Sequence, residues 1–189
     1  FVSGINIFVF SLFFLSVGII VSYLVIFVPK FEYIKIRLLA FLDSNSGNNY
    51  QADKASDAII NGGFFGKGIG EGVLKNRVPE AHTDYIVSVI SEEFGAIIII
   101  FLMLIFLLFI YLVFKKLYSE KNDKIKLILV GSISIILFQA LIHIGVNIRL
   151  FPTTGMTLPF LSYGGSSIIG TSILAGIILN LTSRKIDKL

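Results

Sequence analysis

The residue types best suited to chemistry lie together in residues 79–84, which read PEAHTD. Pro79 is pre-set for a first helical turn, so the sequence predicts a helix that starts there and continues into the next apolar segment. In such a helix Glu80 and Asp84 lie one turn apart on one face, where their mutual repulsion favours one of them as a general base. The alternative is that both acids only stabilise a helix N-terminus.

A metal site in the same segment is a second hypothesis. Glu80, His82 and Asp84 could together bind a hard divalent cation, because carboxylate oxygens are the ligands such ions prefer. The chain has two histidines and no cysteine, which excludes a thiolate metal site, a disulfide and cysteine-based catalysis. The sequence therefore predicts no definite cofactor, and a divalent cation is the one candidate.

A glycine-rich stretch precedes this segment. Residues 66–72 read GKGIGEG and could bring backbone N–H groups and Lys67 close to a phosphate. The spacing fits neither a Walker loop, which needs Ser or Thr after GK, nor GxGxxG, because Glu71 replaces the last glycine. A flexible loop is therefore favoured. Lys67, Lys75 and Arg77 could offset pyrophosphate charge, and a solvated loop face is the alternative for each of them.

Membrane-spanning helices must position these residues. Hydrophobic residues make up 55% of the chain and charged residues 15%, whereas soluble domains have roughly 45–50% and about 25%. The predicted fold class is an all-α polytopic membrane protein, with four transmembrane helices plus a large extracytoplasmic loop with short helices. Charge-free runs close to the ~20 residues that cross a bilayer predict the spans at residues 1–28, 94–114, 127–148 and 164–182.

Positive charge predicts the orientation. The linker at residues 115–126 holds five lysines and the tail at residues 183–189 adds three basic residues, so both are expected in the cytoplasm. Residues 29–93, the loop with the PEAHTD segment, then lie outside. Within that loop, a helix is predicted from Tyr50 to Asn61, with Asn49 as its N-cap and Gly62 as its left-handed C-terminal residue. The net charge of +4 does not indicate nucleic acid, because the basic residues flank the spans.

Two further groups of residues are predicted to be structural. Gln139, His143 and Asn147 follow one another at spacings of four, along one stripe of the third span. Such groups prefer the bundle interior, so a helix-to-helix hydrogen-bonding face is favoured over a site. Residues 149–163 are expected to form an extracytoplasmic or re-entrant turn, because helix-breaking residues interrupt the chain there and at the start of the fourth span: Pro152, Gly155, Pro159, Gly164 and Gly165.

Four stretches resemble the SEDS family (shape, elongation, division and sporulation), whose members are FtsW, RodA and SpoVE. They are RLLAFLD (37–43), AIINGGFFGKGIGEG (58–72), RVPEAHTDYIVSVISEEFG (77–95) and NIRLFPTTGMTLPFLSYGGSS (147–167). The last two are highly specific. The wording of the first and of GMTLPFLSYGGSS looks most like the cell-division branch, FtsW.

The resemblance implies the C-terminal portion of a ten-span bacterial protein of the cytoplasmic membrane and division septum. Members polymerise lipid II outside the membrane, so a peptidoglycan glycosyltransferase is expected. The expected partners are a class B penicillin-binding protein, which supplies the transpeptidase, and other division proteins. The Asp of the PEAHTD motif, here Asp84, is the family's proposed catalytic residue. The 189 residues alone are expected to be inactive.

The chain departs from the family pattern at two positions. Thr154 occupies a position where many division members have Lys, which puts in question the basic contact expected beside the turn at residues 149–163. At the second position, Tyr85 replaces the commoner Phe. Two other functions stay open. A lipid II flippase or transporter is favoured by the polar stripe and the broken fourth segment, which resemble devices of transporters. A non-catalytic division scaffold would use the glycine-rich loop as a docking surface.

Overall fold

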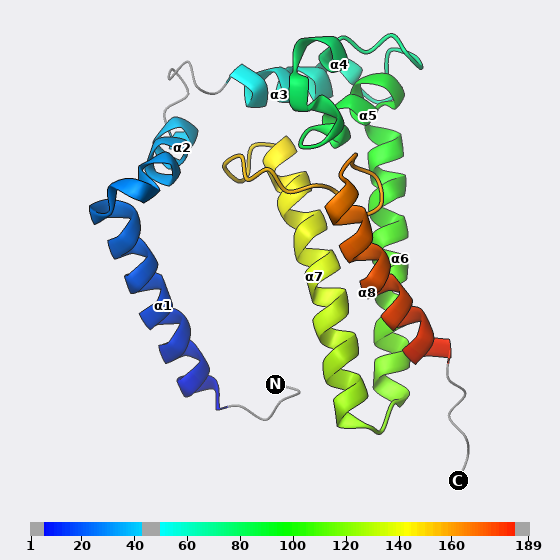
Figure 1. The fold of residues 1–189 in the computed structure, drawn as a ribbon. Helices are drawn as coiled ribbons and strands as arrows, with labels where there is room; N and C mark the ends of the chain where they lie inside the picture. The colour runs from blue at the N-terminus through cyan, green and yellow to red at the C-terminus, as the bar shows by residue number, and fades with distance from the viewer. Residues whose placement is uncertain (1–5, 43–49, 184–189) are drawn as a thin grey trace. The chain divides into compact units, whose positions relative to one another are not determined.

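The computed structural model describes residues 6–42 and 50–183, which form helices, turns and bends but no strand (Figure 1). The chain divides into two compact units, Phe1–Asn49 and Tyr50–Leu189. The predicted N-cap Asn49, the end of the RLLAFLD stretch and the basic tail after Ser183 lie outside the described residues.

The first unit contains one long apolar helix. Helix α1 (Ile7–Phe27) begins at Asn6, whose side chain accepts a hydrogen bond from the N–H of Phe8 at 3.0 Å. Its 21 residues carry no charge and are long enough, at ~1.5 Å each, for the ~30 Å of a bilayer core. A 3₁₀ turn, η1 (Pro29–Phe31), and the mixed polar and apolar helix α2 (Glu32–Leu42) follow, because proline ends the α1 hydrogen-bond ladder.

The second unit contains three long helices that pack side by side (Figure 1): α6 (Ala96–Ser119), α7 (Asp123–Asn147) and α8 (Gly165–Ser183). Together with α1 they are the four described helices that are long and apolar enough to cross a membrane, so the predicted fold class is confirmed. Helix α7 begins before the predicted span because the Asn122 side chain caps it, accepting from the Lys124 N–H at 3.0 Å. The bundle core comprises Val113, Leu129, Ile133, Ile136 and Ile178.

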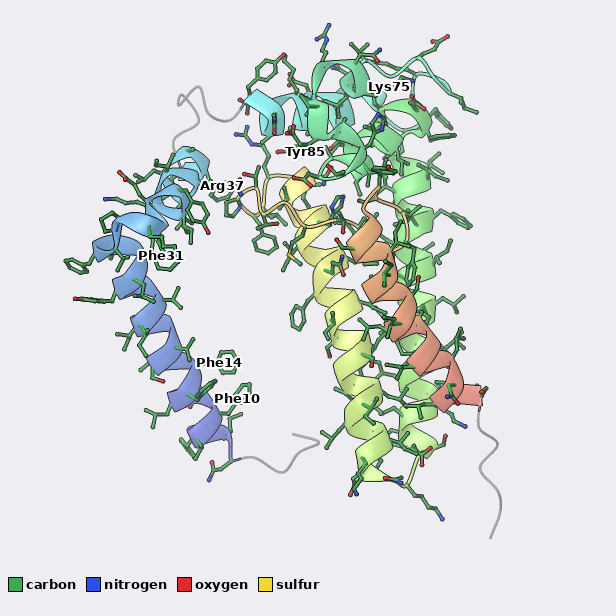
Figure 2. All side chains as sticks on the ribbon, viewed as in Figure 1. Phe10, Phe14, Phe31, Arg37, Lys75 and Tyr85 are labelled. Carbon is green, nitrogen blue, oxygen red and sulfur yellow. The ribbon has the colours of Figure 1, made fainter. Side chains whose placement is uncertain are left out.

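Four short elements, which we call the loop helices, lie over one end of this bundle (Figure 1): α3 (Tyr50–Gly62), α4 (Leu74–Arg77), the 3₁₀ turn η3 (Pro79–His82) and α5 (Ile86–Phe94). Their shared core contains small residues of α3 and reaches Val146 near the end of α7: Ala55, Ala58, Leu74, Val78, Ala81, Tyr85, Val89 and Val146. Figure 2 shows Tyr85 between the loop helices and this end of α7. The core therefore joins the loop helices to the bundle.

The predicted helix from Tyr50 exists, but its end differs in detail. Gly62 is the last residue of α3, and the left-handed residue is Gly63, with φ of 58°. Gly62 is required for another reason, because a Cβ there would lie 2.1 Å from the backbone oxygen of Ser91. The glycine thus permits α3 to cross α5 in close contact.

The prediction of one helix from Pro79 into the second span is wrong. Helix η3 ends at His82, α5 starts only at Ile86, and Gly95 separates α5 from α6 with φ of 81°. The Thr83 hydroxyl donates to the Glu80 carbonyl at 3.1 Å, a local bond that competes with helix propagation. Asp84 consequently lies in a turn between two helical segments.

Candidate active site

The candidate catalytic residue, Asp84, is half-buried in this turn. Its N–H donates to the Glu80 carbonyl at 3.0 Å, and its own carbonyl accepts a hydrogen bond from Asn147 Nδ2 at 2.9 Å. A Cβ added at Gly155 would lie 3.8 Å from Asp84 Oδ2, so the carboxylate lies against the backbone of the α7–α8 loop, residues 148–164. Hydrogen bonds thus fix the backbone of the turn on both sides of the Asp84 side chain.

Asn147, the last residue of α7, makes most of this connection. It is fully buried, and besides Asp84 its Nδ2 donates to the His143 carbonyl at 2.8 Å. Its Oδ1 accepts from the Ser88 N–H at 3.1 Å and from Ser88 Oγ at 2.7 Å. The N-cap residue of α5, Tyr85, makes no side-chain capping hydrogen bond. The N–H groups in the first turn of a helix have no acceptor within the helix, and Asn147 supplies one for the Ser88 N–H. Helix α7 therefore positions both the turn and the helix that follows it.

The α7–α8 loop holds the turn from the other side. Ser162 Oγ donates to the Thr83 carbonyl at 2.7 Å and accepts from the Leu158 N–H at 2.8 Å, and the Tyr163 N–H donates to the His82 carbonyl at 3.0 Å. The five predicted helix-breaking residues lie in this loop or directly after it. Pro159 is buried, Gly155 has φ of 74°, Gly164 packs against Thr157, Pro152 lies in irregular backbone, and Gly165 begins α8.

The other two residues of the polar stripe bind this loop. Gln139 Nε2 donates to the Thr157 carbonyl and to Ser167 Oγ, each at 3.0 Å. His143 Nδ1 lies 2.7 Å from the Met156 carbonyl, which can only accept, so Nδ1 carries a proton. His143 Nε2 is buried and has no hydrogen-bond partner among the residues that the structure describes, and the ring is close enough to Asp84 for an electrostatic interaction.

Glu80 and His82 are exposed beside Asp84. Glu80 Oε2 accepts a hydrogen bond from Gln51 Nε2 at 2.7 Å, which ties η3 to α3. In residues 6–42 and 50–183, no three His, Asp or Glu side chains are grouped closely enough to hold a metal ion. The structure does not bring Glu80, His82 and Asp84 together as a ligand set, so we take the metal hypothesis no further.

Lys67 of the glycine-rich stretch and Lys75 of α4 form ion pairs with α5. Lys67 Nζ lies 2.9 Å from Glu92 Oε1, and Lys75 Nζ lies 2.7 Å from Glu93 Oε1. Burial raises the pKa of Glu92, but hydrogen bonds from Lys67 and from two backbone amides outweigh it and hold the pKa below its ordinary value. The hydrogen bond from Lys75 lowers the pKa of Glu93. Arg77, at the end of α4, is exposed and has no ion pair within the described residues.

Sequence reasoning missed several positioning residues. Ser88 and Ser162 are almost completely buried, and Arg149 pairs with Asp53 of α3 at 2.7 Å. One signal was available for Ser162, because an irregular segment at membrane depth needs buried hydrogen-bond partners for its backbone. Glu92 gave no such signal, because its burial results from the glycine-rich segment folding back over α5.

The fold and the site define a class: a polytopic α-helical membrane protein with a carboxylate-bearing turn held at one end of its bundle. Residues 1–186 match the model of the FtsW/RodA/SpoVE family, described as cell cycle protein, and the chain belongs to that family. The resemblance inferred from the sequence is thereby confirmed.

Individual relatives agree with this assignment. The chain is 39% identical over 158 residues to the probable peptidoglycan glycosyltransferase FtsW of Caulobacter vibrioides, covering 82% of this chain and 40% of the relative. It is 38% identical over 188 residues to the protein of the same name from Buchnera aphidicola subsp. Schizaphis graminum, covering 96% and 52%. A solved structure described as "Structural coordination of polymerization and crosslinking by a peptidoglycan synthase complex" matches 95% of this chain and 50% of its own, with a TM-score of 0.65 and 26% identity. The chain thus spans about half the length of these proteins or less.

Proposed function

We propose that the full-length protein is a peptidoglycan glycosyltransferase that polymerises lipid II into glycan strands during bacterial cell division. The observation that carries the proposal is the fixed turn around Asp84. Asn147 and Ser162 hold the backbone on either side of this residue, and the residue as a whole is half-buried. The names of the relatives support the reaction class.

In the proposed reaction, Asp84 acts as the general base. The acceptor sugar hydroxyl transfers its proton to the carboxylate while its oxygen attacks the anomeric carbon of the donor. The bond from that carbon to the pyrophosphate oxygen breaks, and undecaprenyl pyrophosphate leaves with the bonding electrons. A base held in position contributes typically about 10²–10⁴ in rate. The hydrogen bonds of the turn serve this step by keeping the carboxylate at one place.

Charge on the leaving pyrophosphate requires a cation nearby. Lys67 and Lys75 are neutralised by their own carboxylates, so either would have to exchange Glu92 or Glu93 for the substrate. Arg77 has no such competitor among the described residues and is the first candidate of the three. Glu80 and His82, exposed beside Asp84, are further candidates for contact with the sugars.

We infer the location from the predicted orientation of the chain in the membrane, and the partners from the family to which the chain belongs. The lysine-rich segment 115–126, which includes the end of α6 and the start of α7, would lie in the cytoplasm, so the loop helices would lie outside the cytoplasmic membrane. From the family we infer a position at the division septum. Polymerised strands require crosslinking, so the expected partner is a class B penicillin-binding protein acting with other division proteins. The structure related to this chain is described as a peptidoglycan synthase complex, which supports a partner of this type.

A lipid II transporter is the second candidate, favoured by the irregular α7–α8 loop and by the buried His143 Nε2, which no group in residues 6–42 and 50–183 satisfies. Purified full-length protein in liposomes containing lipid II separates the two. A polymerase yields glycan strands from lipid II in the outer leaflet, even without its transpeptidase partner. A transporter moves fluorescent lipid II between leaflets and yields none, and a scaffold does neither.

A further inference from the structure

Two large apolar side chains are exposed in the glycine loop, residues 63–73, which sequence analysis left without a function. The Phe64 and Phe65 residues are 69% and 84% exposed, although phenylalanine is normally buried. The same loop carries the charges of Lys67 and Glu71. Flexibility alone does not explain a pair of aromatic rings at this place.

The backbone of this phenylalanine pair is fixed to the start of a membrane-spanning helix. The Ala96 N–H donates to the Gly63 carbonyl at 2.9 Å, and the Ile97 N–H donates to the Phe64 carbonyl at 3.4 Å. The glycine loop thus satisfies N–H groups in the first turn of α6 that have no acceptor within the helix. A Cβ at Gly95 would lie 2.1 Å from the Phe64 carbonyl oxygen, so only glycine permits this approach.

The second attachment runs through the end of α5. The Lys67 and Gly68 N–H groups donate to the carbonyls of Glu92 and Glu93, at 2.9 and 3.0 Å. A Cβ at Gly66 would lie 2.2 Å from the Glu93 carbonyl oxygen, and Gly66 has φ of 79°. The alternating glycines therefore hold Phe64 and Phe65 close against the junction of α5 and α6.

The length of α6 determines the depth of that junction. Residues 96–114 carry no charge, and at ~1.5 Å per residue they span roughly 28 Å, close to the ~30 Å of the hydrocarbon core. Because this charge-free stretch is no longer than the hydrocarbon core is thick, Ala96 must lie at the edge of the hydrocarbon core. Ile97, in the first turn, is itself 48% exposed and continues the apolar surface of the helix.

The two lysines near the phenylalanines do not oppose a position at this boundary, and Glu71 is exposed, so its carboxylate can stay in water. Lys67 and Lys75 are each neutralised by a carboxylate within 3 Å, at 2.9 Å from Glu92 and 2.7 Å from Glu93. An uncompensated charge moved from water into the lipid boundary would be costly, whereas a neutral pair is much less so. Aromatic rings are enriched at this depth in membrane proteins.

We propose that Phe64 and Phe65 form an interfacial anchor, which inserts into the lipid of the leaflet beside the N-terminus of α6. The occupant of this surface is the phospholipid bilayer at the boundary between headgroups and acyl chains. The anchor holds the end of α5, and with it the turn that precedes α5, at a constant height above the membrane. The inference rests on the geometry of the loop and does not depend on the proposed chemistry.

Tryptophan fluorescence tests the anchor. These 189 residues contain no tryptophan, so Phe65→Trp can be read in full-length protein whose other tryptophans are replaced by phenylalanine. The matched control is Asn76→Trp, at an exposed position of α4. Both proteins are placed in nanodiscs of phosphatidylglycerol and phosphatidylethanolamine, with or without acyl chains brominated near the headgroup. Aqueous acrylamide is used as the second quencher.

The proposal expects brominated lipid to quench residue 65 and not residue 76, and acrylamide to quench residue 76 more strongly. Acrylamide quenching of residue 65 equal to that of residue 76, without an effect of bromine, would place the loop in water and overturn the proposal. Protection of residue 65 from both quenchers would also overturn it, because another protein segment would then cover the surface. Phe64→Trp, read in the same way, keeps the test informative if the residue 65 variant fails to fold.

Discussion

Replacing Asn147 by leucine removes the main connection between α7 and the Asp84 turn while keeping the size of the side chain. Three hydrogen bonds to other segments are lost, two from Ser88 and one to the Asp84 carbonyl. At a net ~0.5–1.5 kcal/mol each, their loss destabilises the fold by about 2–4 kcal/mol. Asn147 is fully buried, so water cannot replace these bonds.

The same substitution should lower activity more than folding alone explains. Ser88 lies in the first turn of α5, and without Asn147 that turn and Asp84 are free to shift. A displacement of about 1 Å at a reacting group can cost roughly 10²-fold in rate. We therefore expect Asn147→Leu to reduce glycan synthesis per folded molecule by one to two orders of magnitude.

The measurements are reversible unfolding in mixed micelles and polymerisation of lipid II by full-length protein. Asn180→Leu, at an exposed asparagine of α8, is the matched control and should be close to neutral. A double-mutant cycle with Ser88→Ala should give a coupling energy of at least ~0.5 kcal/mol. Equal stability of the Asn147 and Asn180 variants, or a cycle that closes without coupling, would refute the role assigned to Asn147.

Three further predictions concern the polar stripe, the glycine loop and the topology. His143→Leu should lower thermal stability in detergent only modestly, by about 0.6 kcal/mol, with turnover retained, and abolished turnover at unchanged stability would instead indicate a relay. Glu92 and Glu93 have pKa values lowered from 4.5, so their ion pairs stabilise the loop above pH 4.5 and are lost as the pH falls through the lowered values. A spin label at residue 69 should then gain mobility only in acid, and equal mobility throughout a titration from pH 7 down to about pH 2 would contradict this. A cysteine at residue 76 should react with an impermeant thiol reagent in cells without an outer barrier, and one at residue 121 should not; the reverse would invert the topology.

Much of the membrane fold could be predicted because it depends on local composition. Charge-free runs of the right length predicted the four helices, and deviations at their ends arise from capping and from lysines that extend the helix beyond the core. The stripe of α7 was visible as a period of four. Its partners were not, because the carbonyls of Met156 and Thr157 belong to an irregular loop with no periodic pattern.

The parts that could not be predicted depend on contacts between distant segments. The break at residues 83–85 is held by bonds that the α7–α8 loop and Asn147 make to the turn, in addition to the local bond of Thr83, and no propensity near Pro79 encodes these distant contacts. The glycine pattern favoured a flexible loop over a phosphate-binding one, and its spacing says nothing of the α5 carbonyls that hold the segment in place. Burial of Glu92 likewise follows from where that loop folds back.

The central claim is that Asp84 is the base that deprotonates the acceptor sugar, and one pair of variants in full-length protein tests it most directly. Asp84→Asn keeps size and backbone contacts but removes basicity, while Glu80→Gln makes the same change at the neighbouring acid. The account predicts that the Asp84 variant expresses, binds lipid II and associates with its penicillin-binding partner, yet loses about 10²–10⁴ in polymerisation rate, with Glu80→Gln far less affected. Polymerisation by Asp84→Asn at the wild-type rate would contradict the account and reduce Asp84 to a structural residue of the turn.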